Sequence, residues 1–241
     1  MVIKVNGIDL YWEELGEGEP LLWLHGGLGH GADWNFIFKE PPAGHRLIAP
    51  DLRGHGRSTG AATTYSFRQS AVDAFALLDH LRIDRCHLYG QCIGGSFILS
   101  LLQAQPDRVA SAVLAQPIGR VGAMPPGRSA RFDAWAETLT DHPEATPAVL
   151  DALYRNLYAP GFVYCVDRAF VSTCATPCLV LAGNDEAHPL PISEELARLL
   201  PRAEMIREWK AGDALTSARA RVQEFLSKHT PRGVAGEGES S

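Results

Sequence analysis

The amino-acid sequence predicts an α/β fold with a mostly parallel central sheet and helices on both faces of that sheet. Short apolar runs alternate with amphipathic segments along the chain, which is typical of parallel strands joined by crossover helices. The runs are almost continuously apolar, as expected of strands that are covered on both faces. A chain of 241 residues, 46% of them hydrophobic, can bury one sizeable core. The runs expected to form strands are residues 21–25, 46–50, 86–90, 111–115 and 177–183.

An antiparallel hairpin is expected before these strands. The segments VIKVNG and DLYWEE meet at Asn6 and Gly7, and an Asn-Gly pair between two such segments is a strong signal for a tight turn. The hairpin therefore adds an antiparallel edge to the parallel sheet.

The clearest helix is expected from Ser66 to about Leu81. Ser66 and Gln69 fit a capping box at its start, and apolar residues recur along one face at helical spacing. This face is formed by Phe67, Ala71, Phe75 and Leu78. Further helices are expected at 93–104, 194–200 and 217–228.

Residues 120–170 interrupt this alternation with a turn-rich stretch and two short apolar stripes. Two helices inserted here would cover the carboxyl ends of the strands, where ligands bind in sheets of this type, so we expect a small helical lid. The core is then expected over 1–119 and 171–230, and the tail at 231–241 is expected to be disordered. The stripes are Phe132, Trp135 and Leu139, followed by Val149, Leu153 and Leu157.

Charge and cysteine usage narrow the classes of partner. A formal charge of −6 and a pI near 5.8, with no cluster of Lys and Arg, argue against a nucleic-acid or anionic membrane surface. No apolar run approaches the roughly 18 residues of a membrane span, and the N-terminal stretch lacks a signal-peptide pattern. We therefore expect a cytoplasmic protein that binds a small molecule, with neither nucleic acid nor membrane as partner. The five cysteines form no CxxC pair, which predicts neither a disulfide framework nor a metal site, and no cofactor is expected.

The segment Gly90-Gln91-Cys92-Ile93-Gly94 lies between a predicted strand and a predicted helix. A sharp turn there would direct the Cys92 side chain outward, with glycines preventing collisions on either side, and the helix N-terminus would stabilise a thiolate. A second glycine-rich loop, at 25–29, follows another strand. We therefore expect the backbone N–H groups of Gly27 and Ile93 to hold the oxyanion formed when Cys92 attacks a carbonyl. From the glycines alone, a small buried side chain at Cys92 fits equally well.

Five segments together resemble the α/β-hydrolase superfamily in their order and spacing. They are NGIDLYWEELGEGEPLLWLHGG, HRLIAPDLRGHGRS, GQCIGG, RVASAVLAQPIG and CLVLAGNDEAHP. The resemblance extends to about residue 230 and is most similar to the lid-bearing esterase and carbon-carbon hydrolase branch, while a GxCxGG turn is also similar to dienelactone hydrolases. It implies that Cys92 is the nucleophile, where most members have serine, and that Gly27 and Ile93 are the oxyanion donors. It also implies that Asp185 is the acid that orients a histidine, although a capping role at the next turn fits Asp185 too.

The resemblance further implies a histidine on the loop after the last strand, and this sequence has none there. Counting from EMIREWK, the slot falls near Asp213 in a loop that is about five residues short. His188, close behind Asp185, is the histidine proposed to manage the proton of Cys92, although an HP pair near the acid is also common without that role. A cysteine tolerates the loss better than a serine because a thiol ionises far more readily. Loop-bracing roles are expected for His25 and His55, and turn-forming roles for Asp51, Arg53 and Ser58.

Three functions are compatible with these residues. The leading hypothesis is a cofactor-independent hydrolase-like enzyme whose Cys92 attacks an ester, lactone or thioester carbonyl. The second is a lyase or isomerase in which Asp185 or His188 shuttles a proton and no acyl-enzyme forms. The third is a small-ligand binding protein without turnover, which the missing histidine favours. The lid predicts an apolar or aromatic ligand, but a helix that packs onto the core would carry the same residues: Phe132, Trp135, Tyr154, Leu157 and Tyr158.

Overall fold

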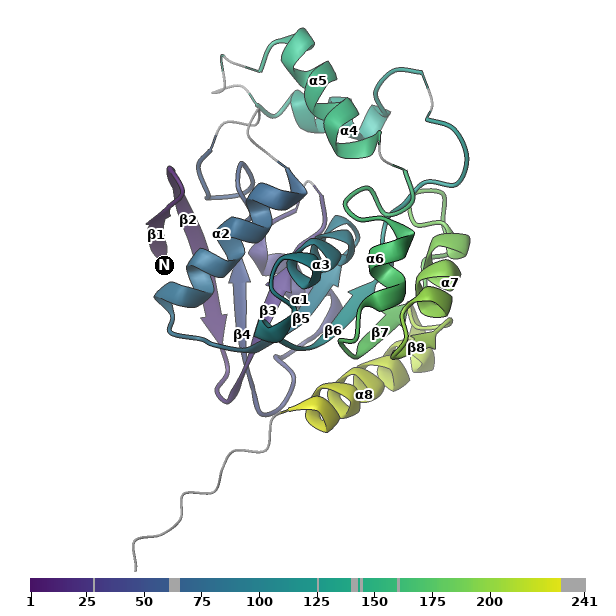
Figure 1. The fold of residues 1–241 in the computed structure, drawn as a ribbon. Helices are drawn as coiled ribbons and strands as arrows, with labels where there is room; N and C mark the ends of the chain where they lie inside the picture. The colour runs from purple at the N-terminus through teal and green to yellow at the C-terminus, as the bar shows by residue number, and fades with distance from the viewer. Residues whose placement is uncertain are drawn as a thin grey trace, which may run out of the picture.

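The computed structural model describes residues 1–27, 29–60, 66–124, 126–139, 143, 145–159 and 161–230. Within these ranges an eight-stranded sheet forms the centre of the protein (Figure 1). The tail at 231–241, which the sequence predicts to be disordered, lies outside the described residues.

The sheet has the strand order β1-β2-β4-β3-β5-β6-β7-β8. β1 and β2 form the predicted antiparallel hairpin, turned at Asn6 and Gly7, which both have positive φ. β2 pairs antiparallel with β4, and the pairings from β4 across to β8 are parallel. The predicted fold class is therefore confirmed. The strands are Val2–Val5, Ile8–Leu15, Glu19–Leu24, His45–Pro50, Cys86–Gln91, Val109–Ala115, Cys178–Leu181 and Ala203–Ile206.

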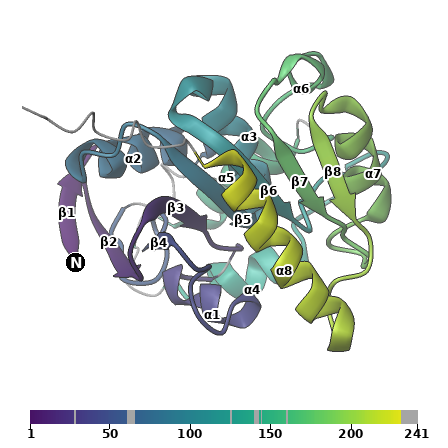
Figure 2. The same cartoon turned by 90° about the horizontal axis from the view of Figure 1, so that it is seen from below.

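Helices cover both faces of the sheet, as the apolar strands predict (Figures 1 and 2). One apolar cluster joins the strands to α2 (Phe67–His80), α3 (Ile93–Ala104) and α7 (Leu190–Leu199). A second cluster, on the opposite face, joins them to α1 (Trp34–Ile37) and α8 (Gly212–His229). Alternate residues of one strand enter different clusters: Leu22 and Leu24 face the first, and Leu21 and Trp23 the second. This two-sided burial explains why the central strands are mostly apolar, with few polar residues such as His87 of β5 and Ser111 of β6.

The start of α2 matches its sequence signal in part. The Ser66 side chain accepts a hydrogen bond from the backbone N–H of Gln69, at 3.0 Å, and so caps the helix. The Gln69 side chain donates to Asp73 instead, at 3.2 Å. The serine cap is thus confirmed, whereas the glutamine contributes to a different contact.

Two helices begin earlier than predicted. α7 begins at Leu190, ahead of the predicted 194–200, because Pro191 falls in the first turn, where its missing N–H costs nothing. α8 begins at Gly212, ahead of the predicted 217–228. Gly212 has φ of +54°, which a glycine adopts readily, and it turns the chain from extended Ala211 into the helix. No helix in the described ranges has the length and apolarity that crossing a membrane requires.

The segment between β6 and β7 carries α4 (Ala130–Ala136) and α5 (Pro147–Tyr158), which lie beyond one end of the sheet (Figure 1). Arg128 joins the two helices through ion pairs with Asp133 and Asp151, at 2.6 and 2.8 Å. Arg120 donates from its guanidinium to the carbonyl oxygens of Tyr158 and Ala159, at 2.6 and 2.9 Å. These contacts tie the end of α5 to the chain that leaves β6.

The following helix, α6 (Arg168–Thr173), lies across the predicted boundary between lid and core. Its residue Val171 is fully buried in the cluster that also holds α2 and α3. The division at residue 170 stays a prediction.

The buried His87 of β5 makes the stability of the fold depend on pH. Its Nδ1 lies 2.8 Å from Ser111 Oγ, and burial, with a contribution from nearby His45, lowers its pKa to about 4. A histidine in an unfolded chain has a pKa of about 6.5, so the unfolded state takes up this proton first as the pH falls. The stability is therefore complete above pH 6.5 and is lost toward pH 4.

We expect the free energy of unfolding to fall across this interval by up to roughly 1.4 kcal/mol per pH unit for this histidine. Urea unfolding at a series of pH values measures the slope. The variant His87→Gln has no charge to gain and should show a shallower slope. A slope that is the same in both proteins would contradict this assignment.

Candidate active site

Cys92 lies at a sharp turn between β5 and α3. Its backbone angles are φ 58° and ψ −116°, a strained combination for a residue other than glycine. The Cys92 N–H donates to Ala115 of β6 at 2.9 Å, which holds the turn against the sheet. A strained conformation held by its surroundings is a feature of functional sites.

The glycines beside Cys92 are required by close packing of the backbone. A Cβ atom on Gly94 would collide with the carbonyl oxygen of Leu24, and one on Gly90 would collide with the carbonyl oxygen of Gly94. The start of α3 therefore lies directly against the end of β3. Close backbone packing therefore explains why both positions of the motif are glycine.

The loop after β3 brings Gly27 to the same place. Gly27, Cys92 and Ile93 all line one cavity, and a Cβ added to Gly27 would lie 3.6 Å from the Ile93 side chain. The two residues expected to supply oxyanion donors therefore lie close together beside the sulfur-bearing residue.

His25 braces this loop. Its Nε2 accepts a hydrogen bond from the backbone N–H of Leu52 at 2.9 Å, and its Nδ1 lies 2.7 Å from the carbonyl oxygen of Gly26. An accepting Nε2 carries no proton, so Nδ1 is the donor. Complete burial, reinforced by the nearby His55, lowers the pKa of His25 to about 3. The expected bracing role is thus confirmed by a neutral histidine that joins two loops.

The DLRGHGRS segment forms the predicted turn. Asp51 accepts hydrogen bonds from the N–H groups of Gly31 and Arg57, at 2.7 and 2.8 Å, and the Ser58 hydroxyl donates to the carbonyl oxygen of Asp51 at 2.6 Å. Burial alone would raise the pKa of Asp51, but the bonds from Arg57 and Gly31 outweigh it and lower that pKa. Arg53 forms a buried pair with Asp73 of α2, at 2.7 Å.

His55 also lies in the cavity wall, which the sequence did not predict. It lines the cavity and its ring stacks on that of Trp135 in α4, with 6.0 Å between centroids and an interplanar angle of 20°. Its Nδ1 lies 2.9 Å from the carbonyl oxygen of Arg53, which agrees with loop bracing. His55 therefore belongs to the cavity wall as well as to the turn.

Asp185 follows β7 and holds two partners from different loops. Its Oδ1 accepts from the N–H of His188 at 2.9 Å and lies 2.7 Å from His188 Nδ1. Its Oδ2 lies 3.1 Å from Lys210 Nζ. Partial burial would raise the pKa of Asp185, but the hydrogen bonds from Lys210 and His188 outweigh it and lower that pKa. Asp185 is thus a carboxylate paired with an imidazole of its own loop.

His188 itself is buried, with 6% of its surface exposed. Its neighbours Ala187 and Pro189 line the cavity together with Asp185. Asp185 and His188 are therefore in contact, as the sequence predicts, but only Asp185 lines the cavity, and His188 is not among the described residues of the cavity wall.

Asp213 does not occupy a place in this arrangement. It is exposed in the first turn of α8, because the helix begins at Gly212 and takes up the residues counted as a loop. Lys210 extends from the same segment to Asp185 instead. Sequence reasoning missed Lys210, and its one signal was a cation that directly follows an aromatic residue, Trp209, in the segment after the last strand.

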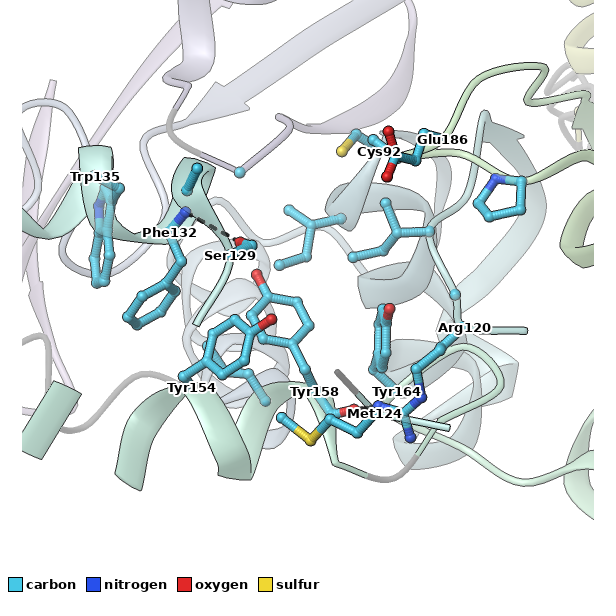
Figure 3. A pocket seen from close by; sticks show the side chains of 18 of the residues that line it. Cys92, Arg120, Met124, Ser129, Phe132, Trp135, Tyr154, Tyr158, Tyr164 and Glu186 are labelled. Carbon is cyan, nitrogen blue, oxygen red and sulfur yellow. Dashed lines mark hydrogen bonds between the residues drawn. The ribbon is translucent and has the colours of Figure 1, made fainter. Parts of the chain in front are cut away.

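The cavity has a volume of about 830 Å³. Cys92 and Glu186 lie on one side of it, across from the rings of Tyr154 and Tyr158 on α5 (Figure 3). Neighbouring rings are in contact along α4 and α5, with centroid distances of 5.0 Å from Phe132 to Tyr154 and 4.9 Å from Tyr154 to Tyr158. The wall opposite Cys92 is accordingly aromatic, with phenol hydroxyls as its polar groups.

Comparison with known proteins identifies the family to which this chain belongs. A family model described as the alpha/beta hydrolase fold matches residues 19–145, and the chain belongs to this family. It is 39% identical over 118 residues (48% of this chain, 32% of the relative) to the dihydrolipoyllysine-residue acetyltransferase component of the acetoin cleaving system of Pseudomonas putida. It is 35% identical over 121 residues (48% of this chain, 43% of the relative) to 2-hydroxymuconate semialdehyde hydrolase of Pseudomonas sp. (strain CF600). The chain spans less than half the length of these relatives.

A solved structure supports the same fold over nearly the whole chain. The meta-cleavage product hydrolase of Pseudomonas fluorescens IP01 superposes with a TM-score of 0.71 at 20% identity, covering 95% of this chain and 97% of the other. The predicted superfamily is confirmed, and the matched relatives include hydrolases.

The close packing at Gly94 predicts a steep cost for any side chain there. Gly94→Ala should lower the free energy of unfolding by about 2–3 kcal/mol, because the carbonyl of Leu24 belongs to a central strand and cannot move away. Gly27→Ala is the matched control, since its added Cβ meets only ordinary contacts, and it should lie within about 1 kcal/mol of wild type. Urea unfolding measures both, and equal stabilities in the two variants would contradict the packing argument.

Proposed function

We propose that this protein is a cofactor-independent hydrolase that uses Cys92 as a covalent nucleophile on an ester, lactone or thioester carbonyl. The single observation that carries the proposal is the strained turn at Cys92, which lines the 830 Å³ cavity together with Gly27, Ile93 and Asp185. A buried structural cysteine needs no positive φ and no cavity before it.

In the proposed reaction the Cys92 sulfur forms a bond to the carbonyl carbon while its proton passes to Nε2 of His188. The electron pair of the carbonyl moves to oxygen, where the N–H groups of Gly27 and Ile93 hold the charge. Collapse expels the alcohol or thiol, which takes up the proton. Water then attacks the carbonyl carbon of the Cys92 thioester and passes one proton to Nε2 of His188. Collapse breaks the carbon–sulfur bond and releases the acid, the proton returns to the Cys92 sulfur, and Asp185 stays ionised throughout.

The Asp185–His188 contact supports this assignment of roles. A Nδ1–H that donates to Asp185 Oδ1 leaves Nε2 of the same ring as the basic nitrogen. A thiol also needs less help from a base than a hydroxyl does. Under this proposal, His188 on the loop after β7 replaces the histidine that the family resemblance implies for the loop between β8 and α8.

A small-ligand binding protein without turnover is the second candidate. The observation that favours it is the segment after β8, where Lys210 and not a histidine pairs with Asp185. A ligand that raises the melting temperature and is recovered unchanged would support binding alone.

The apolar or aromatic character of the substrate is part of the proposal. The ring contacts of the lid and the cavity volume of about 830 Å³ suit a flat apolar acyl group that packs against Tyr154 and Phe132. The carbonyl group of the bound substrate would then point toward Cys92, while its apolar part lies against the aromatic wall opposite.

The nucleophile is tested by trapping. Incubation with activated acyl esters followed by intact-mass analysis should add one acyl group, and peptide mapping should locate it on Cys92. Cys92→Ala should form no adduct and should lose at least 100-fold in turnover. An adduct elsewhere, or none, contradicts the proposal, and turnover that persists in Cys92→Ala indicates a reaction without acyl-enzyme.

Cys165→Ala is the control for this experiment. Burial raises the pKa of the Cys165 thiol to about 12, and this thiol donates to the Ser96 carbonyl oxygen at 3.0 Å. A thiol of that kind is unreactive, so the control variant should acylate as wild type does.

The lid predicts a selective effect of Trp135→Leu. Loss of the indole should raise KM about tenfold for an ester with an aromatic acyl group, the equivalent of one aromatic contact, and should change the acetyl ester little. Steady-state kinetics on the two esters measures the difference. Phe170→Leu, on α6, is the control, and equal changes on both esters in Trp135→Leu would contradict an aromatic acyl site.

A further inference from the structure

Lys210 makes a contact with Asp185 that the proposed reaction does not yet use. Its Nζ lies 3.1 Å from Asp185 Oδ2, while Oδ1 of the same carboxylate takes both contacts from His188. The two oxygens thus have different partners, one from the loop after β7 and one from the segment after β8.

The structure fixes Lys210 at this place through its neighbour. Trp209 is buried, with 3% of its surface exposed, and its Nε1–H donates to the carbonyl oxygen of Ala182 at 2.8 Å. This bond joins the segment after β8 to the end of β7. Lys210 Nζ makes a second hydrogen bond to Asn184 Oδ1, so the ammonium group contacts two consecutive residues of the β7 loop.

The Asp185 side chain needs such a partner because 46% of it is exposed. The last torsion of an aspartate has a broad energy minimum, so a carboxylate held on one oxygen alone can rotate toward water. A contact on each oxygen restricts that rotation. It keeps Oδ1 facing His188 Nδ1.

We propose that Lys210 is a positioning residue that orients the Asp185 carboxylate and, through it, the imidazole of His188. This inference rests on the proposed function, in which His188 Nε2 accepts the proton of Cys92. Asp185, whose pKa is lowered by its hydrogen bonds from Lys210 and His188, stays ionised during the reaction. The role of Lys210 is to hold Asp185 Oδ1 against Nδ1 of His188, so that the proton of the neutral ring stays on Nδ1.

A positioning role for Lys210 is distinguished from a purely structural ion pair by comparing two effects of its loss, the change in melting temperature and the change in kcat. A partly exposed pair contributes little to stability, so its loss should leave the melting temperature nearly unchanged. A misoriented base reduces the rate of the chemical step much more than substrate binding. The expected signature of Lys210→Met is a fall in kcat of about tenfold or more, with KM within about twofold of wild type.

The experiment compares Lys210→Met and Lys210→Arg in the full chain. Arginine keeps the charge and can reach the same carboxylate, so it should restore most of kcat. Lys228→Met is the matched control, because Lys228 forms an exposed ion pair with Glu204 at 3.4 Å, on α8. This control should have the kcat of wild type.

A second readout is the protonation state of the His188 ring. The ¹⁵N chemical shifts of the neutral imidazole distinguish a proton on Nδ1 from one on Nε2. Wild type and Lys210→Arg should show the Nδ1–H form, and Lys210→Met should show a mixture of the two forms. An unchanged Nδ1–H form in Lys210→Met overturns the inference, whatever happens to kcat.

The two proposals fail separately. An acyl adduct on Cys92 in wild type, together with unchanged kcat in Lys210→Met, removes the role of Lys210 and leaves the nucleophile in place. An absent adduct removes the proposed function, and the ring ¹⁵N shifts still decide whether Lys210 orients the Asp185–His188 pair.

Discussion

The contact between the start of α3 and the end of β3 is the constraint on which the site depends. Gly94 packs against the carbonyl oxygen of Leu24 so closely that no side chain fits between them. Because α3 lies this close, the backbone at Cys92 must turn sharply, and its side chain points away from the sheet into the cavity. The same approach brings Ile93 beside Gly27. A small change in the distance between one helix and one strand would therefore displace the proposed nucleophile and both expected oxyanion donors together.

The Asp185 carboxylate has contacts from its own loop and from a second segment of the chain. Asp185 and His188 are three residues apart, and the backbone N–H of His188 bonds to the same carboxylate oxygen that faces its ring. The pair is thus preorganised by one short turn. Lys210 adds a contact from the neighbouring loop, so the geometry of the pair depends on the packing of Trp209 against the end of β7. Contacts within one loop and a contact from a second segment thus together determine the orientation of the Asp185 carboxylate.

Much of this fold could be predicted because its signals are local. The central strands are almost continuously apolar, and the Asn6-Gly7 pair is a specific signal for a hairpin turn. α3 has its predicted bounds because it begins directly after the turn at Cys92. The start of α8 was predicted wrongly because Gly212 and its neighbours resemble a loop, and a glycine at positive φ can equally open a helix. The contacts of Lys210 and the stacking of His55 on Trp135 could not be predicted. Both join segments far apart in the chain, and such partners depend on how the loops pack.

The position of Trp135 has a consequence for spectroscopy. The chain has five tryptophans, and Trp12, Trp23, Trp34 and Trp209 are buried among core residues. Trp135 alone among them lies on α4 and stacks on a cavity histidine. Movement of that helix away from the sheet would expose its indole to water and leave the other four in place. The intrinsic fluorescence of the protein therefore carries a built-in reporter of any movement of α4 relative to the sheet, without any attached dye.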